Sequence, residues 1–234
     1  MGALEKVNVQ SDLDTLQFAE KQLMQLTSIM AEIANQSDEV TRLLQLPGFG
    51  VVTAVTVWAA IGNIQRFADA QHLVGYGGFG TRVHDSGMTT RTGRITKAGR
   101  RDLRVVLIEA AQVAANSHPH WKAELARLQP RLGRNKAIVA IARKLLVTAW
   151  YVLAQHKTDR FAQPEAIAQK FLKFAYQLGK ENRPKGQSAA QFVRQHLETL
   201  QLGQELTSIA WGSKKPIPLP LHQQSERRPT HKIV

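Results

Sequence analysis

The stretch Thr41-Arg-Leu-Leu-Gln-Leu-Pro-Gly-Phe-Gly50 decides how the first part of this chain folds. Leucines close one apolar segment, and Pro47 cannot continue a helix because its ring clashes with the preceding turn. Gly48 and Gly50 allow backbone conformations that other residues rarely adopt, and Val51 to Ile61 reads as a second, apolar helix. This pattern predicts a helix-hairpin-helix, in which free amides at the start of the second helix face a phosphate. A plain helical hairpin without a ligand gives the same pattern.

A glycine-rich break at residues 75–80 and a basic segment at residues 81–104 follow. The glycines are expected to allow a second tight turn, and the basic segment is expected to be a loop that leads into a helix. The segment holds seven cations against two anions: Arg82, Arg91, Arg94, Lys97, Arg100, Arg101 and Arg104 against Asp85 and Asp102. Cations at the start of a helix oppose its dipole, so dipole stabilisation does not explain them. A polyanionic partner does, and the segment therefore predicts nucleic-acid binding.

Residues 10–45 read as one long helix with a heptad seam of about four repeats. The seam positions are Leu16, Ala19, Leu23, Leu26, Met30, Ile33, Ser37, Val40 and Leu44. It is imperfect, because Ser37 is polar and Ala19 is small. The spacing favours a two-stranded coiled coil between protomers, and the alternative is a helix that packs against its own domain.

The remaining chain reads as more helices and a tail. Apolar stripes at helical spacing predict two helices within residues 121–156 and two more at residues 163–178 and 187–202. From Ser213 the proline-rich basic sequence is expected to be disordered. The fold class is therefore mostly α, with four parts: a coiled-coil helix at 1–45, a DNA-binding core at 46–156, a helical extension at 157–212 and a disordered basic tail at 213–234.

Composition narrows the class of protein. The 234 residues carry a formal net charge of +13, which favours nucleic acid or an anionic surface as partner. Cysteine is absent, which excludes disulfides and cysteine-based metal sites. We expect no membrane partner, no signal peptide and a cytoplasmic location. Asp102 and Glu109 lie seven residues apart on one helix face and could bind Mg²⁺, but salt bridges to the neighbouring arginines explain them as well, so no metal site is expected in this chain.

Several motifs in a fixed order resemble the C-terminal domain of the IS110/IS116/IS902 transposases over about residues 41–156. They are Leu46-Pro-Gly-Phe-Gly50, Ile61-Gly-Asn-Ile-Gln-Arg-Phe67, Leu73-Val-Gly-Tyr-Gly-Gly-Phe79, Ser86-Gly87, Gly93-Arg-Ile-Thr-Lys-Ala-Gly99, Leu103-Arg104 and Glu109-Ala-Ala111. The resemblance implies DNA binding and DNA transposition, with a serine of this domain as nucleophile on DNA. Ser86 matches that serine best. Arg82, Arg91 and Arg94 could stabilise charge on the phosphate.

The same resemblance sets expectations about partners. Members of the family carry an N-terminal RuvC-like domain with four acidic metal ligands, a coiled-coil region and this C-terminal domain. The resemblance also implies a structured guide RNA, encoded by the same element, as a partner. That acidic domain would precede the coiled coil, and the present sequence starts nearly inside the coiled coil. Mg²⁺ is therefore expected only with the acidic domain, and this chain is expected to be inactive alone. The alternative function is a catalytically incomplete DNA-binding fragment or a regulator of the full-length transposase.

Overall fold

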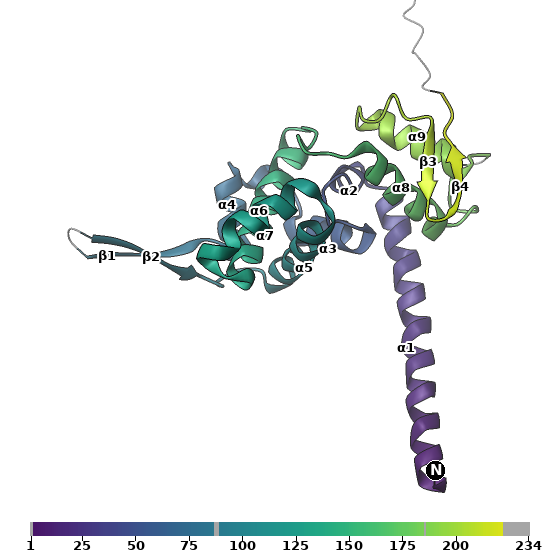
Figure 1. The fold of residues 1–234 in the computed structure, drawn as a ribbon, viewed down its shortest axis with the longest axis horizontal. Helices are drawn as coiled ribbons and strands as arrows, with labels where there is room; N and C mark the ends of the chain where they lie inside the picture. The colour runs from purple at the N-terminus through teal and green to yellow at the C-terminus, as the bar shows by residue number, and fades with distance from the viewer. Residues whose placement is uncertain (1, 87–88, 185, 222–234) are drawn as a thin grey trace, which may run out of the picture.

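A computed structural model of the chain describes residues 2–86, 89–184 and 186–221, and the side chains of residues 82–94 lie outside this description. The described part is mostly helical, which confirms the predicted fold class (Figure 1). A helical body lies between two projections. One is the long helix α1, Ala3–Asn35, and the other is a β-hairpin.

The predicted single helix over residues 10–45 is wrong at its C-terminal end. Helix α1 ends at Asn35, and a separate six-residue helix, α2, spans Asp38–Leu43. The break has a local cause, because the Ser37 side chain accepts a hydrogen bond from the Val40 amide at 3.3 Å and caps α2. Asp38 and Glu39 in the first turn of α2 add favourable charge there. The heptad seam therefore does not continue through Ser37.

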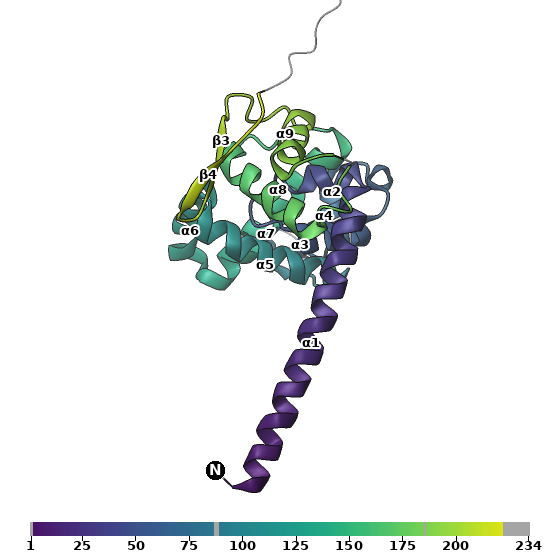
Figure 2. The ribbon, with the colours of Figure 1, turned by 90° about the vertical axis from the view of Figure 1, so that its right-hand side faces the viewer.

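Most of α1 leaves the body, as Figure 2 shows. Its last turns contact α2, α3 and α8. Ala31 and Ala34 are fully buried there, and their small side chains let the helices approach closely. Leu16, Leu23 and Leu26 of the predicted seam are more than half exposed. Coiled-coil association through α1 stays a prediction.

The helical body is built from α3 (Val51–Ile61), η1 (Ile64–Arg66), α4 (Ala70–Tyr76), α5 (Arg101–Ser117), α6 (Pro119–Leu132) and α7 (Arg134–Ala154). Helix α5 packs against α3, α6 and α7, and α7 also contacts α4. The side chains at helical spacing on one face of α5 are buried throughout: Leu103, Leu107, Ala110, Ala111 and Ala114. The stripe of α7 is buried as well: Ile138, Ile141, Ala142, Leu145, Ala149 and Val152. Helical periodicity in the sequence thus located the core correctly.

The basic segment after the glycine-rich break is not the loop that the sequence predicted. Strand β1, Thr81–Ser86, pairs antiparallel with strand β2, Thr89–Ile95, and the hairpin extends away from the body (Figure 1). The signal was present in the β-branched residues on both sides of Ser86: Val83, Thr89, Thr90, Thr92 and Ile95. The loop was predicted because the segment is rich in cations and glycines. Charged side chains are nevertheless compatible with a strand that is exposed to solvent.

The C-terminal part packs on α1 and α2 and ends in a second hairpin. Helices α8, Pro164–Leu178, and α9, Ala189–Thr199, confirm the two helices predicted there. Strands β3, Ser208–Trp211, and β4, Lys214–Pro218, pair antiparallel. The predicted disorder from Ser213 is therefore wrong for residues 214–218, because β3 supplies the backbone partners that an isolated proline-rich segment lacks. Residues 222–234 of the predicted tail lie outside the described part.

One helix in the described part, α7, is long and apolar enough to cross a membrane by length and composition alone. Its apolar side chains are the ones that pack against α5 and α6, so the packing of the body accounts for its composition.

Candidate nucleic-acid interface

The root of the β-hairpin is a tight backbone junction between the glycine-rich break and residues 96–100. The amides of Thr96, Lys97 and Arg100 donate to the carbonyls of Gly80, Gly78 and Tyr76 at 2.8, 3.2 and 3.0 Å. A Cβ on Gly99 would lie 2.3 Å from the Tyr76 carbonyl oxygen, so only glycine fits. The sequence predicted only a tight turn for these glycines. In the structure they also join the hairpin to the start of α5.

Two of the predicted DNA-binding arginines hold this junction together. The Arg100 guanidinium donates to both carboxylate oxygens of Asp102 at 2.9 and 2.5 Å, and to the Tyr76 hydroxyl at 3.5 Å. Arg104 donates to the Gly77 carbonyl at 3.2 Å. The hydrogen bonds from Arg100 lower the pKa of Asp102 to about 2 and raise the pKa of Arg100 itself. The salt-bridge interpretation of Asp102 is confirmed, and both arginines have structural partners.

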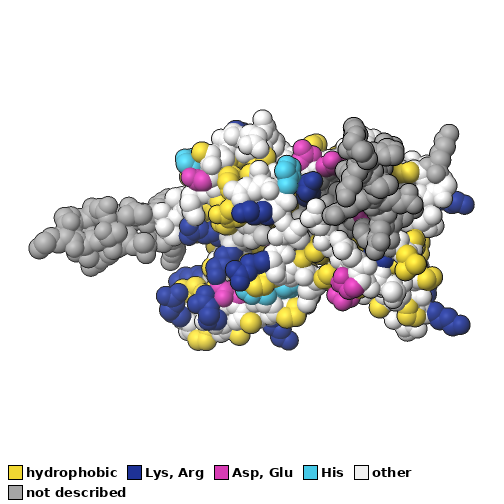
Figure 3. Space-filling view, turned by 90° about the horizontal axis from the view of Figure 1, so that it is seen from above, with side chains coloured by type: hydrophobic (Ala, Val, Ile, Leu, Met, Phe, Trp, Pro, Cys, Tyr) yellow, Lys and Arg dark blue, Asp and Glu magenta, His cyan; other side chains and the backbone are white. Residues whose placement is uncertain are grey.

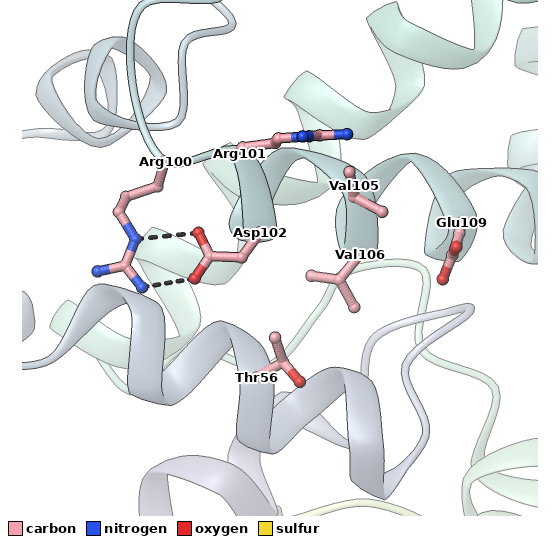
Figure 4. A pocket seen from close by; sticks show the side chains of 7 residues that line it. All are labelled: Thr56, Arg100, Arg101, Asp102, Val105, Val106 and Glu109. Atoms are coloured by element: carbon pink, nitrogen blue, oxygen red, sulfur yellow. Dashed lines mark hydrogen bonds and ion pairs between the residues drawn. The ribbon is translucent and has the colours of Figure 1, made fainter.

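Lys97 and Arg101 differ from their neighbours. Both side chains are exposed, and neither makes an ion pair or hydrogen bond with a side chain that the structure describes. In Figure 4 the Arg101 side chain runs along α5, away from the Arg100–Asp102 pair. It borders an open hollow between α3 and α5 that Thr56, Val105, Val106 and Glu109 also line. These two cations are free to meet a polyanion.

The turn at Leu46–Gly50 presents its two glycines differently. Gly48 has a φ of +78°, and a Cβ there would lie 2.0 Å from the Ala110 carbonyl oxygen of α5. Its conformation and its packing on α5 therefore both require glycine, whether or not a phosphate binds. Gly50 is the exposed N-cap of α3, and no described atom lies within 4 Å of its Cβ position. The space beside Gly50 at the start of α3 is therefore open.

The predicted nucleophile and three of the predicted DNA-binding arginines lie on the hairpin. Ser86 ends β1 and pairs with Thr89, and Arg91 pairs with His84. Arg82 lies within β1 and Arg94 lies within β2. Their side chains lie outside the described part, as does the whole of Gly87. The backbone positions show that these four residues share one projecting hairpin.

A second group of cations on α6 and α7 is divided by the fold. Lys144 and Arg127 both bind the Glu124 carboxylate, and these contacts lower the pKa of Glu124 to about 2. Arg143 donates to Gln71 at 3.1 Å. Arg131 and Lys136 are exposed, and Figure 3 shows Lys and Arg side chains gathered at one end of the body. Glu124 thus neutralises part of the positive charge of α6 and α7, and Arg131 and Lys136 remain exposed.

No group of three histidine or carboxylate side chains suited to a metal ion occurs among the residues that the structure describes. Asp102 faces Arg100 instead of Glu109, so the two carboxylates do not form a site together.

Residues 40–126 match the model of the family described as "Transposase IS116/IS110/IS902 family". This segment is similar to that family, as the resemblance noted in the sequence predicted. The chain is 32% identical over 133 residues to the "Transposase for insertion sequence element IS1111A" of Coxiella burnetii, a match covering 55% of this chain and 36% of that protein. It is 29% identical over 154 residues to the "Pilin gene-inverting protein" of Moraxella bovis, covering 64% and 47%. The matches therefore span less than half the length of these relatives.

Proposed function

We propose that this chain is the DNA-binding part of an IS110-type transposase or recombinase. The family match and the relatives named for transposition and for gene inversion support the class. The observation that carries the DNA-binding half is the pair of exposed cations, Lys97 and Arg101, at the root of a projecting hairpin whose sequence holds Arg82, Arg91 and Arg94. Their neighbours Arg100 and Arg104 already have protein partners, whereas Lys97 and Arg101 gain one when DNA binds.

The proposed interface combines two kinds of phosphate contact. Lys97, Arg101 and the hairpin arginines supply charge, and the amides that follow Gly50 supply backbone donors. Both kinds hold the nucleic-acid backbone without reading its sequence. Target choice would then come from another part of the assembly, for which a guide RNA is the candidate that the family resemblance implies.

The test is binding of duplex DNA to the whole chain at several salt concentrations. The double variant Lys97→Ala/Arg101→Ala should weaken binding and make the slope of log K against log salt shallower by about 2, because each phosphate contact contributes about 0.9 to that slope. The matched control is Lys173→Ala/Lys180→Ala, which removes the same charge from exposed positions of the C-terminal part. Equal effects of the two double variants would attribute binding to net charge and would defeat the proposed interface.

Ser86 is the proposed nucleophile in a complete assembly. Its hydroxyl oxygen would attack a DNA phosphorus and form a transient phosphoserine link, while a base or metal-bound group accepts the serine proton. The bond from that phosphorus to one flanking deoxyribose oxygen would break, and this oxygen would leave as a free hydroxyl at the cut DNA end. Mg²⁺ held by an acidic RuvC-like domain would serve the other strand-cleavage step. A covalent protein–DNA adduct that requires added acidic domain and is lost in Ser86→Ala supports this role. An adduct that persists in Ser86→Ala contradicts it.

The alternative function is a DNA-binding fragment or regulator without chemistry of its own. DNA binding by the whole chain combined with no adduct under any supplied domain, and with inhibition of a full-length transposase, would favour this alternative.

A further inference from the structure

The C-terminal part of the chain reaches back to the Leu46–Gly50 turn through Lys170. The Lys170 ammonium, on α8, donates to the Leu44 carbonyl at 3.1 Å and to the Leu46 carbonyl at 2.5 Å. Both carbonyls belong to the short stretch that ends α2 and begins the turn. The last carbonyls of a helix have no partners within that helix, and a cation is well suited to bind them.

A second contact supports the same stretch from the segment between α7 and α8. Gln45 is 2% exposed, and its side-chain amide nitrogen donates to the Arg42 carbonyl at 2.9 Å. Its side-chain oxygen accepts a hydrogen bond from the Asp159 amide at 2.8 Å. Burial lowers the pKa of Lys170 to about 8, and the buried Asp159 partly offsets this by favouring the ammonium charge. Two segments distant in sequence thus bind three consecutive residues ahead of Pro47.

The position of this stretch determines where the turn presents its amides. Gly48 rests against α5 on one side, and Lys170 holds the chain at Leu44 and Leu46 just before it. Phe49 follows Gly48 and is buried, and the exposed Gly50 comes next. The direction in which the chain enters α3 is therefore set by contacts of the residues that precede that helix.

We infer that Lys170 is a positioning residue for DNA binding: from α8 it holds the Leu46–Gly50 turn so that the amides at the start of α3 face a DNA phosphate. This inference rests on the proposed function. It gives the C-terminal part of the chain a role at the DNA-binding surface without any contact with DNA.

The experiment compares Lys170→Met with a matched variant of the same part, Arg194→Met. Arg194 is also a buried cation that binds carbonyls, those of Pro220 at 2.7 Å, Gly203 at 2.9 Å and Leu206, but it does not touch the turn. Both variants lose a similar kind of stabilisation. Lys173→Met, at an exposed position of α8, controls for loss of charge.

Hydrogen exchange of the Leu46 and Phe49 amides, which donate to the Leu43 and Leu46 carbonyls at 3.0 and 3.2 Å, is the first measurement. Exchange there should become about tenfold faster in Lys170→Met, since charged hydrogen bonds to two carbonyls are lost. It should stay slow in Arg194→Met and Lys173→Met. Lys170→Arg keeps a cationic donor and should restore slow exchange. Unchanged exchange in Lys170→Met, or equal acceleration in Arg194→Met, would overturn the positioning role.

Duplex DNA affinity at fixed salt is the second measurement, made on the whole chain. Lys170→Met should bind several-fold more weakly while its salt slope stays equal to that of the wild type, because no contact between a cation and a phosphate is lost. Unchanged affinity would overturn the inference. Failure of the proposed function is seen separately, as wild-type binding that does not respond to loss of Lys97 and Arg101.

Discussion

Helices α1 and α7 are both long and rich in apolar residues, yet most of α1 is exposed to solvent and α7 is largely buried. The 21 residues of α7 bury Ile141 and Leu145 completely against neighbouring helices. The 33 residues of α1 leave Leu16 and Leu23 55% and 63% exposed. An apolar pattern predicts that a helix will be covered, but not what covers it. Helix α7 is covered by the body of the same chain, whereas the described part of the chain covers only the C-terminal turns of α1, where Ala31 and Ala34 are buried.

The largest effect is expected from a cavity in the body. Leu145→Ala should lower the free energy of unfolding by about 3 kcal/mol, because a fully buried leucine loses its contacts and leaves a void. Urea unfolding followed by circular dichroism measures this loss. Leu23→Ala on α1 is the matched control and should change the same free energy by less than about 0.5 kcal/mol. Comparable losses at the two positions would show that α1 is covered in solution.

A smaller effect is expected from the turn that α5 supports. Gly48→Ala should destabilise the body by about 2 kcal/mol, because the new Cβ meets the Ala110 carbonyl and the backbone φ is positive. Gly50→Ala should cost less, about 1 kcal/mol or below, because its φ is −103° and its Cβ position is open, so only the preference of an N-cap for glycine over alanine is lost. Thermal unfolding of the two variants checks the difference. A Gly50→Ala variant that is destabilised as much as Gly48→Ala would contradict the open surface at the start of α3.

Acid should weaken the contact between α8 and α9. His196 is half-buried against Phe171 and Phe192, with ring centroids 4.9 and 4.2 Å away, and burial lowers its pKa to about 4. The unfolded chain binds the proton near pH 6.5, so stability is present above pH 6.5 and is lost as the pH falls toward 4.

The expected loss is about 1 to 2 kcal/mol, because partial exposure of the ring reduces the effect of the full pKa shift. Unfolding of the wild type and of His196→Leu between pH 7 and pH 4 measures it. The variant should lose this part of the pH dependence. A parallel pH profile for both proteins would assign the acid sensitivity to other groups.

Substitutions in the α1 seam are expected to have the smallest effect on folding. Their main effect is expected on the association of two copies of the chain. Leu16→Ser/Leu23→Ser should leave the unfolding of the body within about 0.5 kcal/mol of the wild type. If the seam joins two copies of the chain, the variant should sediment as a smaller species at concentrations where the wild type associates. A wild type that stays monomeric at all concentrations would remove the coiled-coil hypothesis.

The sequence predicted much of the helical body and little of the junction at the candidate interface. Periodicity placed α3 from Val51 to Ile61 and the buried stripes of α5 and α7, because side chains three and four residues apart share a helix face whatever surrounds them. The hairpin was missed, since its alternation of β-branched residues is interrupted by arginines and glycines. The second hairpin was missed because β4 depends on pairing with β3, which a single segment does not reveal.

By itself the sequence determined the mostly helical class, the position of the core and the excess of positive charge, because these follow from composition and from local spacing. Only the tertiary structure decided which of these cations have a partner within the described part of the chain. Arg100 finds Asp102 and Tyr76, Arg104 finds the Gly77 carbonyl, and Lys97 and Arg101 are left exposed. It also brought Lys170 to Leu44 and Leu46, more than a hundred residues away in sequence. Such partners are chosen by the packing of distant elements, which local spacing does not encode.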